Sequence, residues 1–311
     1  MTRVAIVIVT FNSGAEIGGC LDALAEIPDI EIVVIDNASS DRTRDEVLAR
    51  RIRLIENPRN SGFAAAVNQG VRATTAPLIL SLNPDAWLER GLEALAAHFD
   101  DPQTGAAGGL LTDGNGQPQR GFMARNLPTA TTLIFESLGI NRLWPGNPIN
   151  WHYRCCNTDP MAIARVEQPA GAFLMFSRAA WERLGGFDER FWPAWFEDVD
   201  FCARLRRAGF PVYYNPNAVA QHTGAHSFQA LTLEIRESYW YGNLLGYAAK
   251  HYDSVRFRAV CLAVALGASL RALREFPLEG VKAFAVYGAV FRLAIGHFFR
   301  LRQEHGKTVV R

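Results

Sequence analysis

Short apolar runs alternate with helix-like stretches over the first third of the chain. The runs lack the polar alternation of half-exposed strands, which is typical of strands buried on both faces. Strands that alternate with helices predict a mostly parallel sheet with right-handed crossovers and helices on both faces. The expected strands are 3–9, 31–35, 52–55, 78–82 and 106–111, and the expected helices are about 14–26, 41–50, 61–74 and 89–99.

Polar residues directly follow four of these expected strands. The segments are 10–12, 36–39, 56–60 and 83–85, and each of them contains Asn or Asp. Ligands of such sheets bind beyond the carboxyl ends of the strands. One polar strand end would be an ordinary turn, but four in succession predict a lined pocket.

The second part of the chain is less regular. Gly, Pro and Asn punctuate residues 113–165, which predicts a long irregular insertion. A strand at 171–176, a helix at 178–184 and a second helix at about 198–208 follow, and a strand at 212–214 then leads to His222. We therefore expect a first domain at 1–228, with a regular half at 1–112 and a less regular half at 113–228.

Residues 229–311 form a separate helical region in this interpretation, with helices near 229–251, 254–275 and 278–301. Their longest uncharged apolar run, 259–270, is shorter than the ~18–20 residues that span a bilayer. Basic residues alternate with apolar ones, as in a helix that lies in the membrane interface. A helical hairpin that packs on the catalytic core or on a second subunit of a homodimer would show the same pattern.

Composition narrows the setting. The chain has 311 residues, 49% of them hydrophobic, and a net charge of +1, so the total charge implies no nucleic-acid partner. The charge is uneven, because residues 1–250 carry 22 Lys and Arg against 27 Asp and Glu, whereas residues 251–311 carry 10 against 4. The five cysteines include an adjacent pair and form no metal-ligand spacing, which favours the reducing cytoplasm. The apolar run at 3–9 is too short for a signal peptide.

Several motifs, in their order and spacing, resemble the family 2 glycosyltransferases and in particular the rhamnosyltransferase-like branch that uses dTDP-rhamnose. The resemblance spans about residues 3–228, and the C-terminal helices carry little of it. It implies a GT-A fold with a Rossmann-like central sheet, a divalent metal and inversion at the anomeric carbon. It also implies that 1–228 is the catalytic domain, with a nucleotide-binding half at 1–112 and an acceptor and catalytic half at 113–228. The motifs are 9–12, 36–41, 56–63, 82–85, 171–173 and 185–188 together with 196–200.

The strand ends supply the expected nucleotide site. The Asp36 carboxylate could accept a hydrogen bond from the imide N–H of uracil or thymine, and the resemblance assigns it that role, with Thr10 along the base. Arg59 could lie near the nucleotide or be a solvated surface cation. The other expected nucleotide-binding residues are Asn12, Asn60 and Asn83, the last of them facing ribose or sugar.

Asp85 is the expected metal ligand. It occupies the last position of the family's Asp-x-Asp motif, whose first acid is replaced here by Asn83. Mg²⁺ prefers oxygen ligands and usually keeps several waters, so one carboxylate and a substrate phosphate suffice. His222 matches a family histidine near the metal or diphosphate, and its imidazole would favour Mn²⁺. His226 is a rival to His222.

Three acids at the start of the helix near 197 compete for the role of catalytic base. Successive residues turn by ~100° around a helix, so Asp198 shares a face with Phe201 and Leu205 and is expected to point inward. Glu197 and Asp200 are expected to point away. The resemblance also makes Asp198 the base, while the alternative is that these acids only stabilise the first helical turn.

The acceptor is expected to lie beside this helix. Trp195 could stack on a sugar, Glu197 could hydrogen-bond it, and Gly171 could allow a close approach to the backbone. The sequence therefore predicts an inverting, metal-dependent glycosyltransferase. It would move L-rhamnose from dTDP-rhamnose onto a saccharide or polyprenyl-diphosphate-linked acceptor for cell-surface polysaccharide, in the cytoplasm or at the inner membrane face.

Three other classes of protein share parts of this pattern. A transferase could use a UDP-sugar donor instead, because uracil offers the same imide N–H. A non-catalytic nucleotide-sugar-binding protein would share the pocket but not the base. A sugar-nucleotide pyrophosphorylase needs a basic Gly-rich loop after the first strand, and residues 10–14 contain no Lys or Arg.

Overall fold

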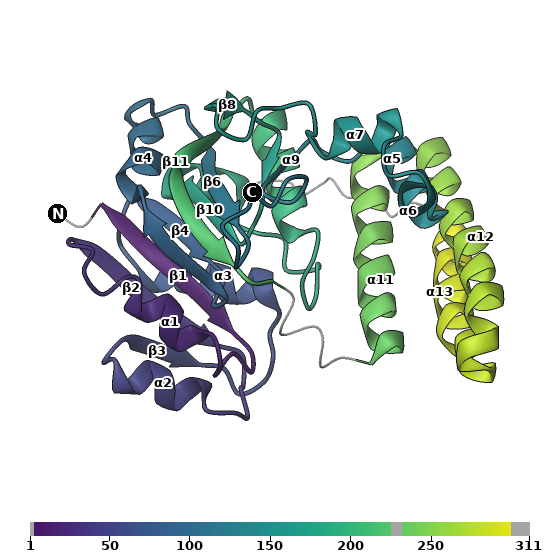
Figure 1. Ribbon diagram of the computed structural model, residues 1–311, viewed down its shortest axis with the longest axis horizontal. Helices are drawn as coiled ribbons and strands as arrows, with labels where there is room; N and C mark the ends of the chain where they lie inside the picture. The colour runs from purple at the N-terminus through teal and green to yellow at the C-terminus, as the bar shows by residue number, and fades with distance from the viewer. Residues whose placement is uncertain (1–2, 225–231, 300–311) are drawn as a thin grey trace, which may run out of the picture. The chain divides into compact units, whose positions relative to one another are not determined.

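The computed structural model describes residues 3–224 and 232–299 and divides the chain into two compact units. Unit 1 is drawn from Met1–Leu127 and His152–Ala230, and unit 2 from Pro128–Trp151 and Leu231–Arg311. In Figure 1 the teal helices of residues 130–143 lie beside the yellow-green C-terminal helices of the same unit. Residues 128–151 thus group with the C-terminal helices, whereas the sequence analysis had assigned them to the catalytic domain. The roles expected for the two domains stay a prediction.

Unit 1 is built on a nine-stranded, mostly parallel sheet, which confirms the expected fold class. Four neighbouring strands, β3, β2, β1 and β4, run parallel to one another. β10 is antiparallel to β4 and β6, and β11 is parallel to β6 and antiparallel to β5. Along the sheet the order is β3 (Arg53–Glu56), β2 (Ile30–Asp36), β1 (Val4–Thr10), β4 (Leu78–Leu82), β10 (Phe173–Ser177), β6 (Ala106–Thr112), β11 (Val212–His222) and β5 (Ala86–Arg90), and β8 (Ala164–Arg165) pairs with β11. A separate two-stranded sheet joins β7 (Ala124–Arg125) to β9 (Gln168–Pro169).

Helices cover both faces of the sheet, so its strands are apolar on both sides, as predicted. Val4, Ile6 and Ile8 of β1 belong to one core cluster, and Ala5 and Val7 belong to the other. The first cluster includes residues of three helices, α1 (Ile17–Asp22), α2 (Thr43–Ala49) and α4 (Leu92–Ala96). The second cluster includes residues of α3 (Phe63–Ala73), α8 (Arg178–Leu184) and α9 (Glu197–Arg207). The short helix η1 (Ala97–Asp100) directly follows α4.

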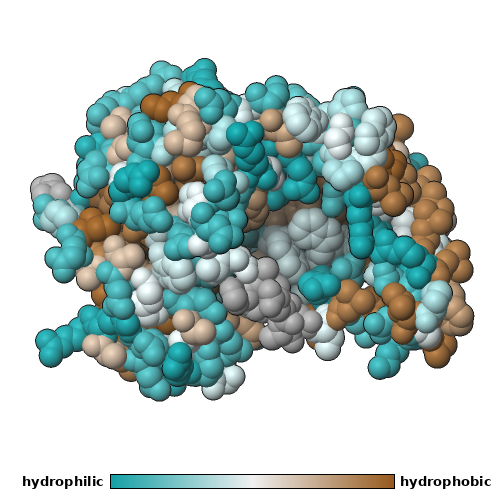
Figure 2. Space-filling model, in the orientation of Figure 1, coloured by the Kyte–Doolittle hydropathy of each residue, from teal (hydrophilic) through white to brown (hydrophobic). Residues whose placement is uncertain are grey.

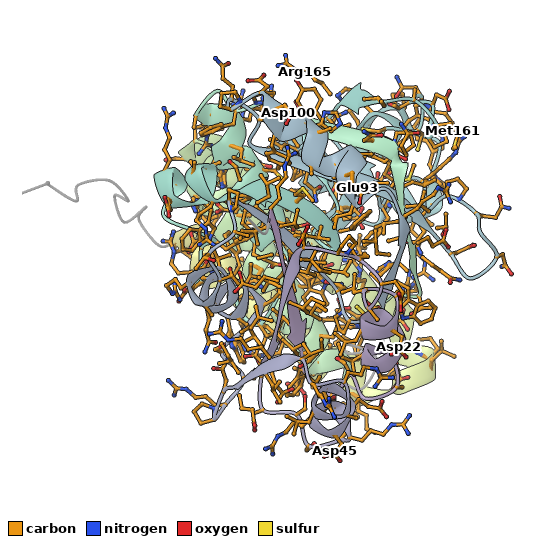
Figure 3. The ribbon with its side chains drawn as sticks, turned by 90° about the vertical axis from the view of Figure 1, so that its left-hand side faces the viewer. Asp22, Asp45, Glu93, Asp100, Met161 and Arg165 are labelled. Atoms are coloured by element: carbon orange, nitrogen blue, oxygen red, sulfur yellow. The ribbon has the colours of Figure 1, made fainter. Side chains whose placement is uncertain are left out.

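The charged residues of the first helical layer lie on its outside. In Figure 3 the labelled side chains of Asp22, Asp45 and Glu93, from α1, α2 and α4, lie at the outer surface of this layer. Each of these helices therefore has one buried apolar side and one charged exposed side.

Two elements of unit 1 differ from the sequence expectation. Residues 86–90 form β5, where a helix beginning near 89 was expected, because β5 pairs with β11. The expected strand 212–214 extends to His222, because β6 and then β5 supply hydrogen-bonding partners along its length. The second difference carries His222 next to the expected metal ligand.

Unit 2 is helical in the part that the structure describes. It contains α5 (Ala130–Ser137), α6 (Ile140–Leu143), α11 (Leu233–His251), α12 (Ser254–Glu279) and α13 (Val281–Phe299), and α7 (Pro148–Tyr153) crosses its boundary. Residues 113–165 are therefore not wholly irregular. The α5 helix begins with a capping box in which Thr129 and Thr132 exchange hydrogen bonds. The start of the helix expected near 229 falls outside the described residues.

The C-terminal helices pack on one another and on α5. A Cβ added at Gly267 of α12 would lie 2.0 Å from the Ser137 carbonyl oxygen, so only glycine permits this approach. Arg271 Nη1 donates a hydrogen bond to the same oxygen at 2.7 Å. By length and composition alone, α13 is long and apolar enough to cross a membrane, although it contains Lys282 and Arg292. In the structure 28% of this apolar stretch is buried.

Candidate functional site

The polar strand ends lie in a row along one edge of the sheet, as expected. β3, β2, β1 and β4 are neighbours and run parallel. Thr10 at the end of β1 is paired in register with Asp36 at the end of β2, and Asp36 is paired with Glu56 of β3. β4 ends at Leu82, directly before Asn83. The carboxyl edge of the sheet therefore carries all four predicted segments.

Asp36 is buried and its carboxylate is held from two sides. The Thr10 hydroxyl donates to Asp36 Oδ1 at 2.8 Å, and the Ser39 backbone N–H donates to Oδ2 at 2.9 Å. The Ser39 hydroxyl adds a third hydrogen bond, to Oδ1. Each carboxylate oxygen accepts about two hydrogen bonds, so one acceptor position of Oδ2 is left for a ligand donor. Asp36 is thus a fixed acceptor at the strand edge.

Asn12 is exposed and locks its own loop. Its φ of 53° lies in the left-handed region, which Asn tolerates better than most residues. The Asn12 side-chain Oδ1 accepts a hydrogen bond from the Ser40 backbone N–H at 2.8 Å, and the Asn12 backbone N–H donates to the Ser39 hydroxyl at 2.8 Å. These contacts bind the loop after β1 to the loop after β2.

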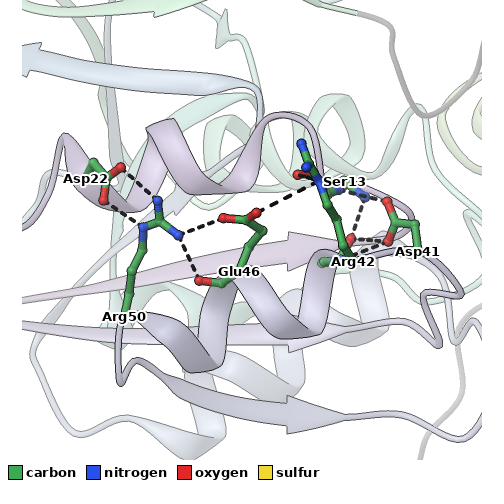
Figure 4. Close-up of polar contacts among 8 residues, drawn as sticks. Ser13, Asp22, Asp41, Arg42, Glu46 and Arg50 are labelled. Atoms are coloured by element: carbon green, nitrogen blue, oxygen red, sulfur yellow. Dashed lines mark hydrogen bonds and ion pairs between the residues drawn. The ribbon is translucent and has the colours of Figure 1, made fainter.

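Hydrogen bonds and ion pairs also join the two helices that follow these loops, α1 and α2 (Figure 4). Arg50 of α2 donates to both carboxylate oxygens of Asp22 on α1, at 2.6 and 2.8 Å, and to Glu46 Oε2 at 2.9 Å. The Gly14 backbone N–H donates to Asp41 Oδ2 at 2.8 Å. This network supports the strand ends that carry Thr10 and Asp36.

Arg59 and Asn60 have different surroundings. Arg59 is exposed and, within the described part of the chain, has no recorded hydrogen bond or ion pair. Asn60 Oδ1 accepts a hydrogen bond from the Gly62 N–H at 2.9 Å, and the Asn60 carbonyl accepts one from the Trp192 indole N–H at 3.4 Å. The backbone N–H of Phe63 donates to the Pro193 carbonyl at 2.7 Å. The segment after β3 therefore supports the aromatic loop that precedes α9.

The two predicted metal ligands face each other. Because β5 pairs with β11, His222 lies in register with Ala86, the neighbour of Asp85. His222 Nε2 is 3.5 Å from Asp85 Oδ1, and both residues are buried. His226, the rival candidate, lies outside the described residues.

Gln119 determines which nitrogen of His222 carries a proton. The Gln119 side-chain N–H donates to the His222 carbonyl oxygen at 2.6 Å, which leaves Gln119 Oε1 as an acceptor 3.1 Å from His222 Nδ1. A neutral imidazole that donates from Nδ1 presents a bare lone pair at Nε2. That lone pair is on the side of Asp85, and the Phe122 ring stacks on the imidazole at 5.2 Å.

This donor set fits a divalent cation. Ligands at right angles, each about 2.1 Å from a metal, are about 3 Å apart, close to the Asp85–His222 separation. In the described part of the chain no group of three or more His, Cys, Asp or Glu side chains could hold a metal. Two protein ligands would therefore leave the other coordination positions for water and diphosphate oxygens, as Mg²⁺ and Mn²⁺ prefer in such sites.

Asp198 lies at the start of α9, and three donors hold its carboxylate. Oδ2 accepts hydrogen bonds from the Gly171 backbone N–H and from the Gln168 side chain, both at 3.0 Å, and Oδ1 accepts one from the Val199 N–H at 2.8 Å. Burial raises the pKa of Asp198 above the ordinary aspartate value, while these hydrogen bonds and the charge of Arg125 oppose the rise. Such a carboxylate is a stronger base than an exposed one.

The orientation expected for the three acids was wrong. Glu197 and Asp200 are both buried, with Asp200 fully so, whereas Asp198 is only half-buried. The first turn of α9 is covered on more than one side, so its helical period does not separate buried from exposed acids. Asp200 accepts a hydrogen bond from Arg204 at 2.7 Å, and burial, followed by the charge of Asp198, raises the pKa of Glu197 well above its usual range. Asp198 is thus the most accessible of the three acids, although it is still partly buried.

The backbone at Gly171 lies close to the Asp198 side chain. A Cβ added at Gly171 would lie 3.0 Å from Asp198 Oδ2. The neighbouring Ala172 carbonyl accepts a hydrogen bond at 3.0 Å from the Asn83 N–H, two residues before Asp85. Two hydrogen bonds therefore connect the segment of the expected metal ligand to the carboxylate of the expected base.

The aromatic loop before α9 has an unusual backbone. Trp195 and Phe196 have φ angles of 77° and 70°, a left-handed conformation that L-residues other than Gly and Asn rarely adopt. Consecutive residues of this kind are found where the surrounding structure holds a site in place. The Trp195 side chain is half-buried. Its expected contact with an acceptor sugar stays a prediction.

Three residues of the site were missed by sequence reasoning. Gln119 contacts His222, Gln168 contacts Asp198, and Arg125 acts on Asp198 through its charge. Gln119 and Arg125 come from the segment that appeared irregular. None of these residues belongs to a motif or a period, so no local signal in the sequence indicates them.

Comparisons with known proteins identify the class of protein to which this sheet and its polar carboxyl edge belong. The sequence profile of glycosyl transferase family 2 matches residues 5–156, and that of glycosyl transferase family group 2 matches residues 92–301. The chain belongs to glycosyl transferase family 2, and it is a glycosyltransferase.

Curated relatives match most of the chain. An N-acetylglucosaminyl-diphospho-decaprenol L-rhamnosyltransferase of Mycobacterium tuberculosis is 31% identical over 240 residues, which cover 71% of this chain and 76% of that protein. A low-salt glycan biosynthesis hexosyltransferase of Haloferax volcanii is 23% identical over 298 residues, which cover 92% of this chain and 89% of that protein.

Solved structures share the fold. A mannosyltransferase from Pyrobaculum calidifontis in complex with GDP-Man and Mn²⁺ has a TM-score of 0.56 and 17% identity, with 96% of this chain and 87% of that chain covered. GalNAc-T7 with UDP, GalNAc and Mn²⁺ has a TM-score of 0.57 and 16% identity, with 80% and 50% covered. The GT-A fold expected from the sequence is confirmed.

Proposed function

We propose that this glycosyltransferase moves L-rhamnose from dTDP-rhamnose, with inversion, onto a saccharide or polyprenyl-diphosphate-linked saccharide. The observation that carries the proposal is the hydrogen-bonded connection between the Asp85–His222 pair and the Asp198 carboxylate through Asn83, Ala172 and Gly171. A diphosphate-binding pair and a proton acceptor would thereby border one sugar. The relative at 31% identity, an L-rhamnosyltransferase, supports the choice of sugar.

The chain's own residues would perform the transfer as a single displacement. Asp36, held by Thr10 and Ser39, would accept the imide N–H of the base, and Arg59 would lie near the phosphates. Asp198 would take the proton of the acceptor hydroxyl, whose oxygen forms a bond to the anomeric carbon as the bond from that carbon to the diphosphate oxygen breaks. Attack opposite the leaving group inverts the anomeric centre.

Asp85 and His222 would hold a divalent metal, Mg²⁺ or Mn²⁺. When bound, such a cation offsets the charge that develops on the departing nucleoside diphosphate. The mannosyltransferase and GalNAc-T7 structures above both contain Mn²⁺, which supports this part of the proposal.

A donor screen tests the proposal. The purified chain is incubated with dTDP-rhamnose, UDP-N-acetylglucosamine or UDP-galactose, a pyrophosphate-lipid acceptor analogue and Mg²⁺ or Mn²⁺, and the release of dTDP or UDP is measured. We expect release from dTDP-rhamnose, and a loss of about 10²–10⁴-fold in Asp198→Asn, which retains the shape but not the base. If only a UDP-sugar releases its nucleotide, the donor is that UDP-sugar and not dTDP-rhamnose. If Asp198→Asn is as active as wild type, Asp198 is not the catalytic base.

A non-catalytic role gives a different result. A protein that only binds nucleotide sugars would show a thermal shift with dTDP-rhamnose and metal but no release from any donor. The same plate of donors therefore separates the two functions.

We also propose that the helical unit contacts the inner face of an anionic membrane, where a lipid-linked acceptor would lie. Five apolar residues of α12 are between 49% and 64% exposed and recur every three or four positions, which places them on one face. They are Leu262, Leu266, Leu270, Leu273 and Phe276, and we call them the α12 stripe. Figure 2 shows brown, hydrophobic side chains gathered over α12 and α13. Helix surfaces that face solvent are normally polar, so this apolar face indicates contact with an apolar partner.

Charge favours a lipid surface as the occupant. Exposed basic side chains accompany the stripe: Arg256, Arg258, Arg274, Lys282 and Arg292. Apolar residues flanked by Lys and Arg are typical of helices that lie among anionic headgroups. Positively charged edges of two identical copies would repel each other, which disfavours a homodimer through this face.

Flotation with phosphatidylglycerol vesicles at low salt tests the contact. We expect the wild-type chain to float and the variant Leu266→Glu with Leu270→Glu to stay in the dense fraction. Leu48→Glu, at an equally exposed leucine of α2, is the matched control and should float. A wild-type chain that stays in the dense fraction would contradict the proposal, and a wild-type dimer that the double variant dissociates would make the face a subunit contact.

A further inference from the structure

Gln168 is a buried amide that contacts the carboxylate of the expected base. It lies in β9 and is 2% exposed. Its side-chain Nε2 donates to Asp198 Oδ2 at 3.0 Å and to the carbonyl of the adjacent Pro169 at 3.3 Å, whereas its Oε1 is buried and, within the described residues, has no hydrogen-bond partner. An unpaired buried carbonyl lowers stability. An apolar side chain would avoid that loss, but it could donate no hydrogen bond to Asp198 or to the Pro169 carbonyl. Of these two bonds, the shorter is the one to Asp198.

The hydrogen bonds divide the two oxygens of Asp198. Oδ2 accepts from both Gln168 and the Gly171 N–H, and among the residues that the structure describes Oδ1 accepts only from the Val199 N–H. An ionised carboxylate oxygen offers about two acceptor positions. Oδ2 is therefore filled, and Oδ1 retains one open position.

We propose that Gln168 is a positioning residue for the transfer reaction: together with Gly171 it fills Oδ2, so that Asp198 Oδ1 is the atom that receives the acceptor's proton. The O–H bond of the acceptor breaks, its proton goes to Oδ1, and the electron pair of that oxygen forms the new bond to the anomeric carbon while the diphosphate leaves. The inference rests on the proposed role of Asp198 as base. It extends that role to the atom and to the residue that selects it.

The charges around Asp198 fix the sign of the effect. Arg125 approaches from β7, and Glu197, Asp200 and Cys202 lie on α9 itself. Burial raises the pKa of Asp198 and of Glu197, and burial also raises the pKa of the Cys202 thiol well above its ordinary value. Gln168 and Arg125 act in the opposite direction on Asp198. Loss of the Gln168 donor therefore raises the pKa of Asp198 further.

A base is active only when ionised, so activity falls as the pH drops through its pKa. In Gln168→Leu we expect the acid limb of kcat/KM to move upward by about one pH unit, as the loss of one hydrogen bond to a charged group implies. We expect kcat to fall more than KM rises, because the residue touches the base and not the substrate. Gln168→Glu should shift the limb further, since two adjacent carboxyl groups resist ionising together.

Ser177→Ala is the control for a merely structural loss. The Ser177 hydroxyl caps α8 by accepting a hydrogen bond from the Ala180 N–H at 3.2 Å and does not contact Asp198. This variant should be destabilised, while its pH profile should match that of wild type. A Gln168→Leu variant that lowers stability but leaves the acid limb in place would overturn the proposal.

A second measurement does not depend on activity. The carboxyl carbon of Asp198 is titrated by NMR in wild type and Gln168→Leu, with its signal assigned from Asp198→Asn. A raised pKa in the variant supports the coupling, and an unchanged pKa refutes it. If no donor reacts with the wild-type chain, the proposed function fails, whereas this titration still decides whether Gln168 tunes Asp198.

Discussion

At the residue scale, the chemistry of the site depends on which hydrogen-bonding positions are already occupied. Asp36, His222 and Asp198 each have neighbours that fill some positions and leave one open. Thr10 and Ser39 do this for Asp36, Gln119 for His222, and Gly171 with Gln168 for Asp198. Such preorganised side chains reorganise little when a substrate binds.

Gln119 offers a direct test of this idea. In Gln119→Leu the Nδ1–H of His222 loses its acceptor, so its tautomer and ring orientation are no longer fixed. We expect Mn²⁺ affinity in the presence of dTDP to fall about 10–100-fold, as is usual when the partner of a ligating histidine is removed. Calorimetric or EPR titration with Mn²⁺ measures it. Gln117→Leu changes an exposed glutamine of the same hairpin and should bind Mn²⁺ as wild type does.

Glu197 makes a prediction about stability and pH. Its carboxyl is buried, its Oε2 has no recorded partner within the described residues, and its pKa is raised well above the usual range by burial. Because the folded state binds this proton more tightly than the unfolded state does, ionisation costs stability as the pH rises above the unfolded value. In Glu197→Gln the free energy of unfolding should rise by about 1 kcal/mol at pH 8.

The pH dependence distinguishes that effect from better packing. At a pH below the unfolded value, Glu197 is protonated in both states, so wild type and Glu197→Gln should be equally stable. Urea unfolding at several pH values measures the difference. A gain that is the same at every pH would show that the charge of Glu197 is not its cause.

At the element scale, local signals set many of the limits of helices and strands. Ser177 caps α8, and Gly185 ends it with a φ of 73°. Gly209, with a φ of 83°, follows α9 at the position that the sequence indicated. β5 has no comparable signal, because only its pairing with β11 makes it a strand.

Close packing of α12 on α5 makes a prediction at this scale. A methyl group at position 267 would collide with the Ser137 carbonyl, a backbone atom that cannot move without the helix. We expect Gly267→Ala to lower the free energy of unfolding of unit 2 by about 1–3 kcal/mol, the usual range for overpacking. Thermal unfolding followed by circular dichroism measures it.

Gly296 provides the matched control in the same unit. It is an exposed residue of α13 where an added Cβ would meet nothing within 4 Å. Gly296→Ala should be neutral or stabilise the helix by up to about 1 kcal/mol, because alanine is the better helix former. If both variants lost the same stability, the contact between α12 and α5 would not be the reason.

At the scale of the whole molecule, charge and apolar surface are segregated along the chain. Residues 251–311 carry 10 Lys and Arg against 4 Asp and Glu, and the α12 stripe lies within them. We expect binding to anionic vesicles to weaken when the salt is raised from about 0.05 to about 0.5 M, because exposed charges are then screened. Co-sedimentation with vesicles measures it. Phosphatidylcholine vesicles, which carry no net charge, should bind less of the protein at both salt concentrations. If binding does not depend on salt, the apolar residues alone make the contact.

The sequence by itself determined the features that depend on neighbouring residues. Unbroken apolar runs specified strands buried on both faces, and polar residues after them specified the binding edge. Asp36, Asp85 and Asp198 could be selected because each follows a strand or begins a helix. Their roles in binding and catalysis are predictions, and Asp198→Asn tests the role of Asp198.

Tertiary structure alone decided the features that join distant parts of the chain. Gln119 meets His222 across 103 residues, and Arg271 reaches the carbonyl of Ser137 across 134 residues. The full burial of Asp200 and the partial burial of Asp198 depend on what covers α9, and the helical period could not reveal that. The physical reason is that backbone preferences act over a few residues, whereas long-range packing determines which side chains share a hydrogen bond.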